Sequence, residues 1–82
     1  SLTMSYLLET ATRYGAVTKS DSTVLQFKAL YIGGAGSVVL KQAGTDGADV
    51  TFAAVPAGTT LYVCGTRVMA ASTATNVVWL DW

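Results

Sequence analysis

Apolar and polar residues alternate in short runs from about residue 23 onward, and small clusters of turn residues separate these runs. The runs are rich in Val, Ile, Thr, Tyr and Phe, which favours strands over helices. Five strands are predicted, near residues 24–32, 37–43, 49–55, 59–70 and 76–82. Because no long helical pattern lies between them, we expect an all-β fold, a small antiparallel β-sandwich or barrel of about five strands.

Glycine-rich clusters mark the predicted turns. The turn glycines are Gly33, Gly34, Gly36, Gly47 and Gly58, the last of them in Pro56-Ala57-Gly58, where proline fixes φ and glycine reverses the chain. Gly65 lies inside the run 59–70 and predicts a bulge or bend. The cluster at residues 33–36 is not followed by the Gly-Lys-Ser/Thr of a phosphate-binding loop, and the next residues predict a strand rather than a helix. A structural turn is the better interpretation.

The first 22 residues differ from the rest of the chain. Leu2, Met4, Tyr6 and Leu8 alternate as in a strand, but Met4, Leu7, Leu8 and Ala11 also match one helical face, so periodicity leaves both open. We therefore divide the chain into an N-terminal arm or connection, residues 1–22, and a β domain, residues 23–82. An arm of this kind could contact a neighbouring subunit.

The composition indicates a subunit of a larger assembly rather than an isolated domain. Charged residues are 12% of the chain and hydrophobic residues 51%, whereas charged residues average about 25% in soluble domains. A surface with so few charges predicts that neighbouring molecules cover part of it. The five basic and five acidic residues are scattered, so no basic patch indicates nucleic acid as a partner. No apolar run approaches the length of about 20 residues that crosses a membrane, and we expect no membrane partner.

Few residues are available for site chemistry. The chain contains one cysteine, Cys64, and no histidine, which excludes an internal disulfide framework, a multi-cysteine metal site and a histidine base. For Cys64 we favour a buried thiol over a covalent bond to another chain. The pattern brings no two of the carboxylates together, and these are Glu9, Asp21, Asp46, Asp49 and Asp81. We predict no enzyme, no cofactor and no metal site.

Two tryptophans lie in the last four residues. On a strand, Trp79 shares a face with Asp81, and Trp82 shares the other face with Leu80. At least one indole should therefore face away from the core, either as a frayed end or as an interface anchor. The candidate interface residues are Leu2, Met4, Tyr6, Leu8, Tyr62, Trp79 and Trp82.

Several segments resemble a known family in the same order along the chain. They are Ala29-Leu30-Tyr31-Ile32-Gly33-Gly34-Ala35-Gly36, Val50-Thr51-Phe52, Val55-Pro56-Ala57-Gly58-Thr59, Thr66-Arg67-Val68 and Thr73-Ala74-Thr75-Asn76-Val77-Val78. The chain resembles, over roughly residues 14–80, the spike base protein family of gene transfer agents and tailed phages.

The resemblance implies a structural virion protein on the outer surface of a phage-like capsid, made in the bacterial host cytoplasm. Its implied partners are copies of itself in a ring, with a pentamer favoured, the major capsid protein, and a head spike or fibre protein. A capsid decoration (cement) protein is an alternative within the same class. A carbohydrate-binding adhesin module that stacks sugars on Tyr62, Trp79 and Trp82 is an alternative from another class.

Overall fold

A computed structural model describes residues 10–43 and 48–82, and all regular structure within these two ranges is β-strand. The strands are β1 Arg13–Ala16, β2 Ala29–Gly34, β3 Gly36–Gln42, β4 Val50–Val55, β5 Thr59–Leu61, β6 Gly65–Val68 and β7 Thr75–Asp81. This confirms the predicted all-β class. No helix in the described part of the chain is long and apolar enough to cross a membrane.

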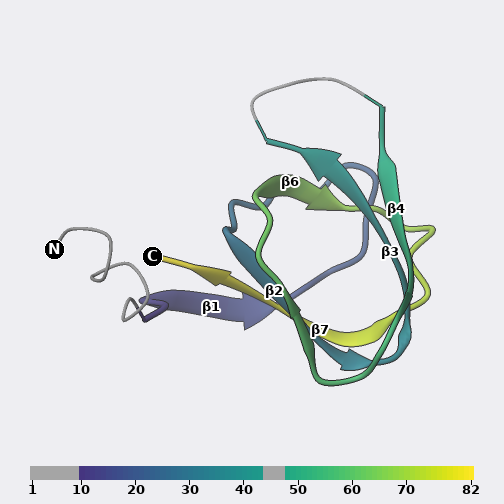
Figure 1. Cartoon of the computed structure of the whole chain (residues 1–82). Helices are drawn as coiled ribbons and strands as arrows, with labels where there is room; N and C mark the ends of the chain where they lie inside the picture. The colour runs from purple at the N-terminus through teal and green to yellow at the C-terminus, as the bar shows by residue number, and fades with distance from the viewer. Residues whose placement is uncertain (1–9, 44–47) are drawn as a thin grey trace, which may run out of the picture.

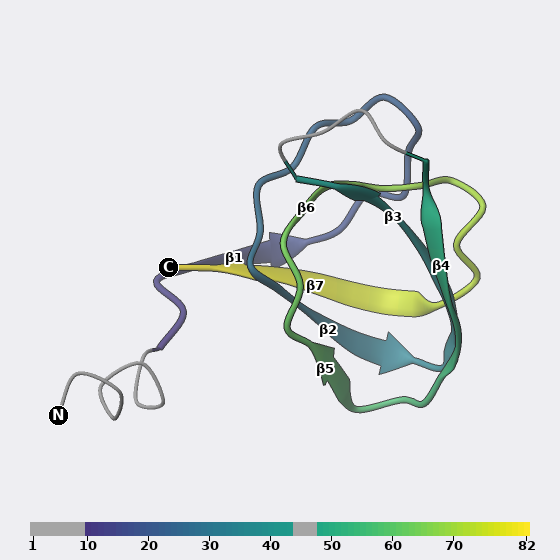
Figure 2. The same cartoon turned by 45° about the horizontal axis from the view of Figure 1, so that its top comes forward.

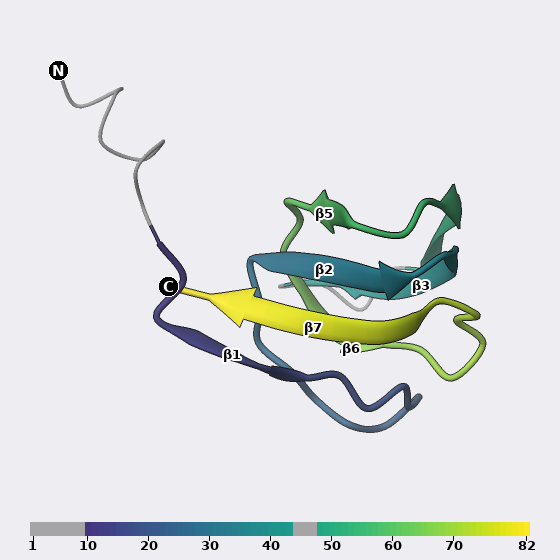
Figure 3. The same cartoon turned by 90° about the horizontal axis from the view of Figure 1, so that it is seen from below.

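The strands form two antiparallel sheets that pack face to face (Figures 1 and 2). The larger sheet has the order β1-β7-β2-β5 and the smaller one the order β4-β3-β6. In the larger sheet Tyr31 of β2 lies opposite Val78 of β7 and Thr60 of β5. Figure 3 shows β1, β7, β2 and β5 side by side from below. The architecture is a small β-sandwich.

The core lies between the two sheets and follows the two-residue period of the strands. Leu30 and Ile32 of β2 are fully buried, as are Val38 of β3 and Val68 of β6. Phe27, in the connection that precedes β2, fills the same cluster and forms a bridge with Gly65. Alternate residues of the strands therefore decide which side chains face the core and which face outward.

One end of the sandwich is closed by close backbone contacts. A Cβ added to Gly36 would lie 2.5 Å from the backbone nitrogen of Ala74, so this position admits only glycine without a shift of the backbone. Gly33 and Gly34 belong to β2, and Ala35 alone separates β2 from β3. The glycine cluster is thus a corner at which the chain passes from one sheet to the other.

Pro56, Ala57 and Gly58 form a turn between β4 and β5. Thr59 donates a backbone hydrogen bond to the carbonyl of Pro56 at 3.3 Å, and Gly58 has a φ of 83°. Gly58 also donates to the carbonyl of Ile32 at 2.7 Å, which ties the turn to β2. Gly47, the other predicted turn glycine, lies outside the described residues.

Three predicted strands differ from the structure. The strand predicted at 24–32 begins only at Ala29. The residues before it lie beside β6 instead, since Leu25 donates a backbone hydrogen bond to the carbonyl of Thr66. The run 59–70 divides into β5 and β6, which belong to different sheets. The chain crosses between the sheets just before Gly65, close to the predicted bend. In β4 the alternation of inward and outward side chains breaks at Ala54, whose φ is 53°. Val55 is therefore buried and Ala54 is exposed.

The segment 1–22 contributes a strand to the sheet. Arg13–Ala16 form β1 at the sheet edge, a part of the predicted arm or connection for which no strand was predicted. Gly15 lies opposite Trp79 of β7, and a Cβ on Gly15 would lie 2.9 Å from the indole ring. Residues 1–9 of the predicted arm lie outside the described residues.

Candidate interaction surfaces

The outer face of the larger sheet is apolar and carries three tyrosines. Leu30, Ile32 and Val77 point into the core, so the residues between them point outward. We call this surface the tyrosine face; its main residues are Tyr14, Tyr31, Tyr62, Val78 and Leu80. Tyr62 joins it because Leu61 and Val63 on either side pack against the core.

The tyrosines of this face are strongly exposed. Tyr14 is 69% exposed, Tyr31 42% and Tyr62 77%. The remaining outward positions of the four strands are alanine, glycine, threonine and asparagine, and none carries a charge. An apolar, aromatic and uncharged sheet face is typical of a surface that another protein covers.

The outer face of the smaller sheet has the opposite character. Lys41 of β3 lies beside Arg67 of β6 and forms an ion pair with Asp49 at 3.1 Å. Thr51 of β4 lies opposite Val39 on the same face. We call this surface the charged face. These charges distinguish it from the tyrosine face, so the sandwich has two chemically different sides.

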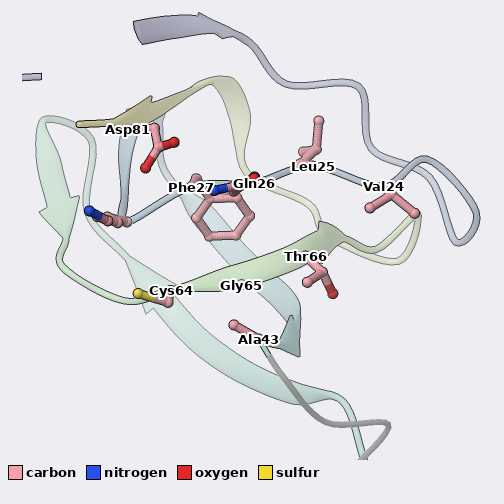
Figure 4. A pocket seen from close by; sticks show the side chains of 10 residues that line it. Val24, Leu25, Gln26, Phe27, Ala43, Cys64, Gly65, Thr66 and Asp81 are labelled. Carbon is pink, nitrogen blue, oxygen red and sulfur yellow. The ribbon is translucent and has the colours of Figure 1, made fainter. Parts of the chain in front are cut away.

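The end of the sandwich opposite the glycine corner is open. A hollow of about 610 Å³ lies there, and its wall is mainly apolar. Figure 4 shows Val24, Leu25 and Phe27 on one side of it and Cys64, Gly65 and Thr66 on another. We call this feature the end hollow. A smaller hollow of about 250 Å³ lies on the other side of Cys64, against Val50 and Phe52.

A buried carboxylate lines the end hollow. Asp81, the last residue of β7, is 1% exposed and forms an ion pair with Arg13 of β1 through Oδ2. Its Oδ1 has no hydrogen-bond partner within the described part of the chain. The hydrogen bond from Arg13 lowers the pKa of Asp81 below its usual value, although burial acts in the opposite direction. Oδ1 is itself buried, so the carboxylate lies behind the wall of the hollow rather than open to it.

Lys28 lies at the rim of the same hollow. Its ammonium donates to the carbonyl of Trp82 at 2.5 Å and lies 5.9 Å from the centroid of the Trp82 ring. The positive charge of Lys28 also lowers the pKa of Asp81, although less than the hydrogen bond from Arg13 does. The cation-π contact holds the last residue of the chain beside the hollow.

The predicted interface residues lie in different environments. Tyr62 is exposed on the tyrosine face, whereas Trp79 points inward and packs against the core. Trp82 is half-buried beneath Lys28. Leu2, Met4, Tyr6 and Leu8 lie outside the described residues. Trp79 thus faces the core, and Trp82 lies just beyond the end of β7.

Sequence reasoning missed Tyr14 and Tyr31 as surface residues. Tyr31 lies between the buried residues Leu30 and Ile32, and the two-residue period of a strand was the signal that could have placed it outward. Tyr14 had no such signal, because the residues around it do not alternate.

Cys64 contradicts its prediction. We expected a buried thiol, but the side chain is exposed at the rim of both hollows. The strand predicted to bury it ends at Leu61, and residues 62–64 cross between the sheets.

The described carboxylates are each engaged separately. Asp21 accepts a hydrogen bond from the backbone nitrogen of Ala70 at 3.0 Å, Asp49 is paired with Lys41, and Asp81 with Arg13. Within residues 10–43 and 48–82, no three His, Cys, Asp or Glu side chains gather as metal ligands. Glu9 and Asp46 lie outside these ranges.

Comparison with known proteins identifies one close structural relative. Over 92% of this chain and 88% of the other, the fold matches a chain of the structure described as "Capsid of native GTA particle computed with C5 symmetry", where GTA denotes a gene transfer agent. The TM-score is 0.76 and the sequence identity 35%. No protein-family model and no curated protein matches the chain.

Proposed function

The chain belongs to the family of the GTA capsid protein to which it is similar, and from this membership we propose that it is a structural protein of a phage-like particle. More specifically, it lies on the outer surface of the capsid and forms an oligomeric base for a head spike or fibre. The observation that carries the proposal is the 35% identity to the capsid chain over 92% of this chain. A match of that extent leaves little of the chain for an unrelated domain.

The surfaces of the molecule support a role based on contact rather than chemistry. The tyrosine face offers aromatic residues without charges, and such residues contribute strongly to protein interfaces. We assign the chain no catalytic step, no cofactor and no metal. Its proposed partners are copies of itself in a ring, with five copies favoured, the major capsid protein, and a spike or fibre protein.

The candidate interface residues keep their proposed role with one change. Tyr62 is a proposed contact on the tyrosine face, and Leu2, Met4, Tyr6 and Leu8 are proposed contacts of the N-terminal arm. Trp82 is a proposed contact beside the end hollow. Trp79 packs against the core, so we propose that it supports the sheet from behind rather than meeting a partner.

A capsid decoration protein is the nearest alternative, and it differs only in carrying no spike. A carbohydrate-binding module has less support, because the inward Trp79 does not offer its indole to a sugar. The three exposed tyrosines are the feature that a sugar could use.

Binding to assembled capsids tests the proposal. The full-length chain with a C-terminal epitope tag is mixed with shells of the major capsid protein from the same genome, and the mixture is sedimented. We expect the chain to sediment with intact shells, in multiples of the number of vertices, and the tag to be accessible to antibody. The same chain should not bind dissociated capsid subunits. Absence of binding to shells, or a tag accessible only after the shells are opened, would overturn the proposal.

A further inference from the structure

The smaller sheet ends at an open edge. Among the described strands, β4 pairs with β3 alone. The other edge of this sheet, β6, is covered by the chain that precedes β2, because Ser20 and Leu25 donate backbone hydrogen bonds to the carbonyls of Val68 and Thr66. In the described part of the chain, β4 is therefore the edge of this sheet that another strand can still join.

The register shows which backbone groups β4 presents at this edge. The carbonyl of Val39 accepts a hydrogen bond from the chain that follows β6, so the backbone of Val39 is directed toward β6. Because this direction alternates along a strand, Leu40 is directed toward β4, and its partner Val50 toward β3. Thr51 then presents both its N–H and its C=O at the open edge. These two groups can pair with an added strand.

The core is incomplete at the same edge. Val50 and Phe52 line the smaller hollow together with Leu40, so both side chains point toward the larger sheet. Val50 is nevertheless 42% exposed, whereas its partner Leu40 is 4% exposed. The larger sheet has four strands and the smaller one three among the described residues. A fourth strand beside β4 would cover Val50 and close the smaller hollow.

The N-terminal segment, residues 1–9, has a sequence that suits this place. Its even positions 2–8 are all apolar, and its positions 1, 3 and 5 are serine or threonine. Paired as a strand, it would direct the apolar side chains to one face and the hydroxyls to the other. The apolar face matches Val50 and Phe52 on the inside of β4, and the hydroxyl face matches Thr51 on the outside.

The segment joins its own domain on the side away from β4. It precedes β1, and the chain that follows β1 runs along β6, where Ser20 is bonded to Val68. β4 lies on the other side of β3. Figures 1 and 2 accordingly show β1 at the left and β4 at the right. A ring of three or more copies joins two different surfaces, and the start of the chain and the β4 edge are two such surfaces.

We infer that residues 2–6 of one copy pair as a strand with the β4 edge of the next copy, so that Leu2, Met4 and Tyr6 cover the smaller hollow. Residues 7–11 can then span up to about 17 Å between the two copies. This inference rests on the proposed function, because it assumes that the chain forms a ring. It adds the edge that receives the N-terminal arm.

Cross-linking between cysteines tests which surfaces meet. Cys64→Ser removes the single cysteine of the chain. In this background Ser5→Cys adds one thiol to the arm, and Thr51→Cys adds another at an exposed position on the outer face of β4. A short bis-maleimide is applied to the isolated chain at high concentration and to purified particles that carry the variant.

We expect a ladder of covalent oligomers from Ser5→Cys/Thr51→Cys that ends at the ring number. Ser5→Cys/Ala16→Cys in the same background is the matched control, because Ala16 is exposed on the tyrosine face, and it should give no ladder. A link between positions 5 and 51 of one chain, identified in the digested peptides by mass spectrometry, would show that the arm pairs with its own β4. A ladder from the control would show that the tyrosine face receives the arm. Either result overturns the inference.

Native mass measurement on the same samples separates the strand pairing from the ring. A ring without a ladder from Ser5→Cys/Thr51→Cys overturns the pairing proposed here and leaves the proposed function intact. Absence of any ring, both in solution and on particles, overturns the ring itself and the pairing with it.

The backbone pairing has its own test. Thr51→Pro removes the N–H at the open edge and no hydrogen bond to β3, so we expect a folded chain that associates about tenfold more weakly. The control is Thr60→Pro in β5. Because its neighbour Thr59 pairs with Ile32, and the carbonyl of Ile32 is directed toward β5, the N–H of Thr60 also points to an open edge. Association of this control should not change.

A proline in the arm tests the same pairing without a change in the β domain. We expect Met4→Pro to weaken association to an extent similar to Thr51→Pro, because it also interrupts the added strand. Circular dichroism verifies that each variant is folded. Association of Met4→Pro equal to that of the unaltered chain would overturn the strand pairing, whether or not Thr51→Pro folds.

Discussion

Arg13, the first residue of β1, forms an ion pair with Asp81, the last residue of β7, across 68 positions of sequence. The two residues are also direct partners in the register of these strands. The Arg13 side chain is 62% exposed and that of Asp81 only 2%. The pair joins the edge strand to the sheet at the open end of the sandwich.

The ion pair between Arg13 and Asp81 should make the stability of the fold depend on pH. The pKa of Asp81 in the folded protein lies below its usual value of 3.8, mainly because Arg13 donates a hydrogen bond to it. A lowered pKa contributes stability above the unfolded pKa, and the contribution is lost as pH falls through the folded pKa. We expect Asp81→Asn to melt at a lower temperature than the unaltered chain near neutral pH. The difference should narrow as the solution is acidified.

Asp49→Asn provides the control for this measurement. The Asp49 ion pair with Lys41 lies on the charged face, and pairs of this kind contribute about 0–1 kcal/mol. Thermal unfolding should be recorded at one protein concentration, because assembly also changes the melting temperature. A constant difference between Asp81→Asn and the unaltered chain at every pH would contradict the role given to the carboxylate.

The glycine corner should tolerate no side chain. A Cβ at position 36 would meet the backbone of Ala74 at 2.5 Å, and only a shift of the backbone could relieve the contact. We expect Gly36→Ala to lower the free energy of unfolding by about 3 kcal/mol. Gly58→Ala is the comparison, because nothing lies within 4 Å of a Cβ there and only its φ of 83° is unfavourable. It should cost about 1 kcal/mol. If urea denaturation showed that both variants lose the same free energy of unfolding, this would contradict the close approach of Gly36 to Ala74.

Substitutions of Trp79 and of Tyr62 should differ in their effect on stability. Trp79 packs against the core and over Gly15, so Trp79→Ala should lower the free energy of unfolding by about 2–3 kcal/mol. Tyr62 is exposed, and Tyr62→Ala should change that free energy by less than about 0.5 kcal/mol. Denaturation followed by circular dichroism distinguishes the two. A loss of stability in Tyr62→Ala as large as that in Trp79→Ala would contradict the opposite orientations of these side chains.

The Cys64 thiol should react in the folded protein. Because the side chain is exposed, we expect one thiol per chain to react with an aromatic disulfide reagent without denaturant. Cys64→Ser supplies the blank. Reaction only after unfolding would mean that the thiol is buried.

The sequence predicted the fold class through the two-residue alternation of its apolar runs. It did not predict β1, because Arg13-Tyr14-Gly15-Ala16 contains no apolar alternation and pairs with β7 alone. Nor did it divide residues 59–70 between two sheets. That run is continuously compatible with a strand, and the change of sheet depends on its pairing with β2 and then β3.

The candidate surfaces were less predictable than the fold. Tyr62 was identified as a surface aromatic, but the tyrosine face also contains Tyr14, which lies far away in the sequence. The end hollow brings Val24, Cys64 and Asp81 together. No local pattern links three positions so far apart, because only the packing of the two sheets makes them neighbours.

Imaging of whole particles tests the central claim most directly. Particles produced from the genome that encodes this chain are compared by electron cryomicroscopy with particles from which its gene has been deleted. We predict density of its size and β-sandwich shape, in a ring on the outer surface at the fivefold vertices, which the deletion removes together with any spike. Density inside the shell or in the tail, or particles identical with and without the gene, would contradict the account.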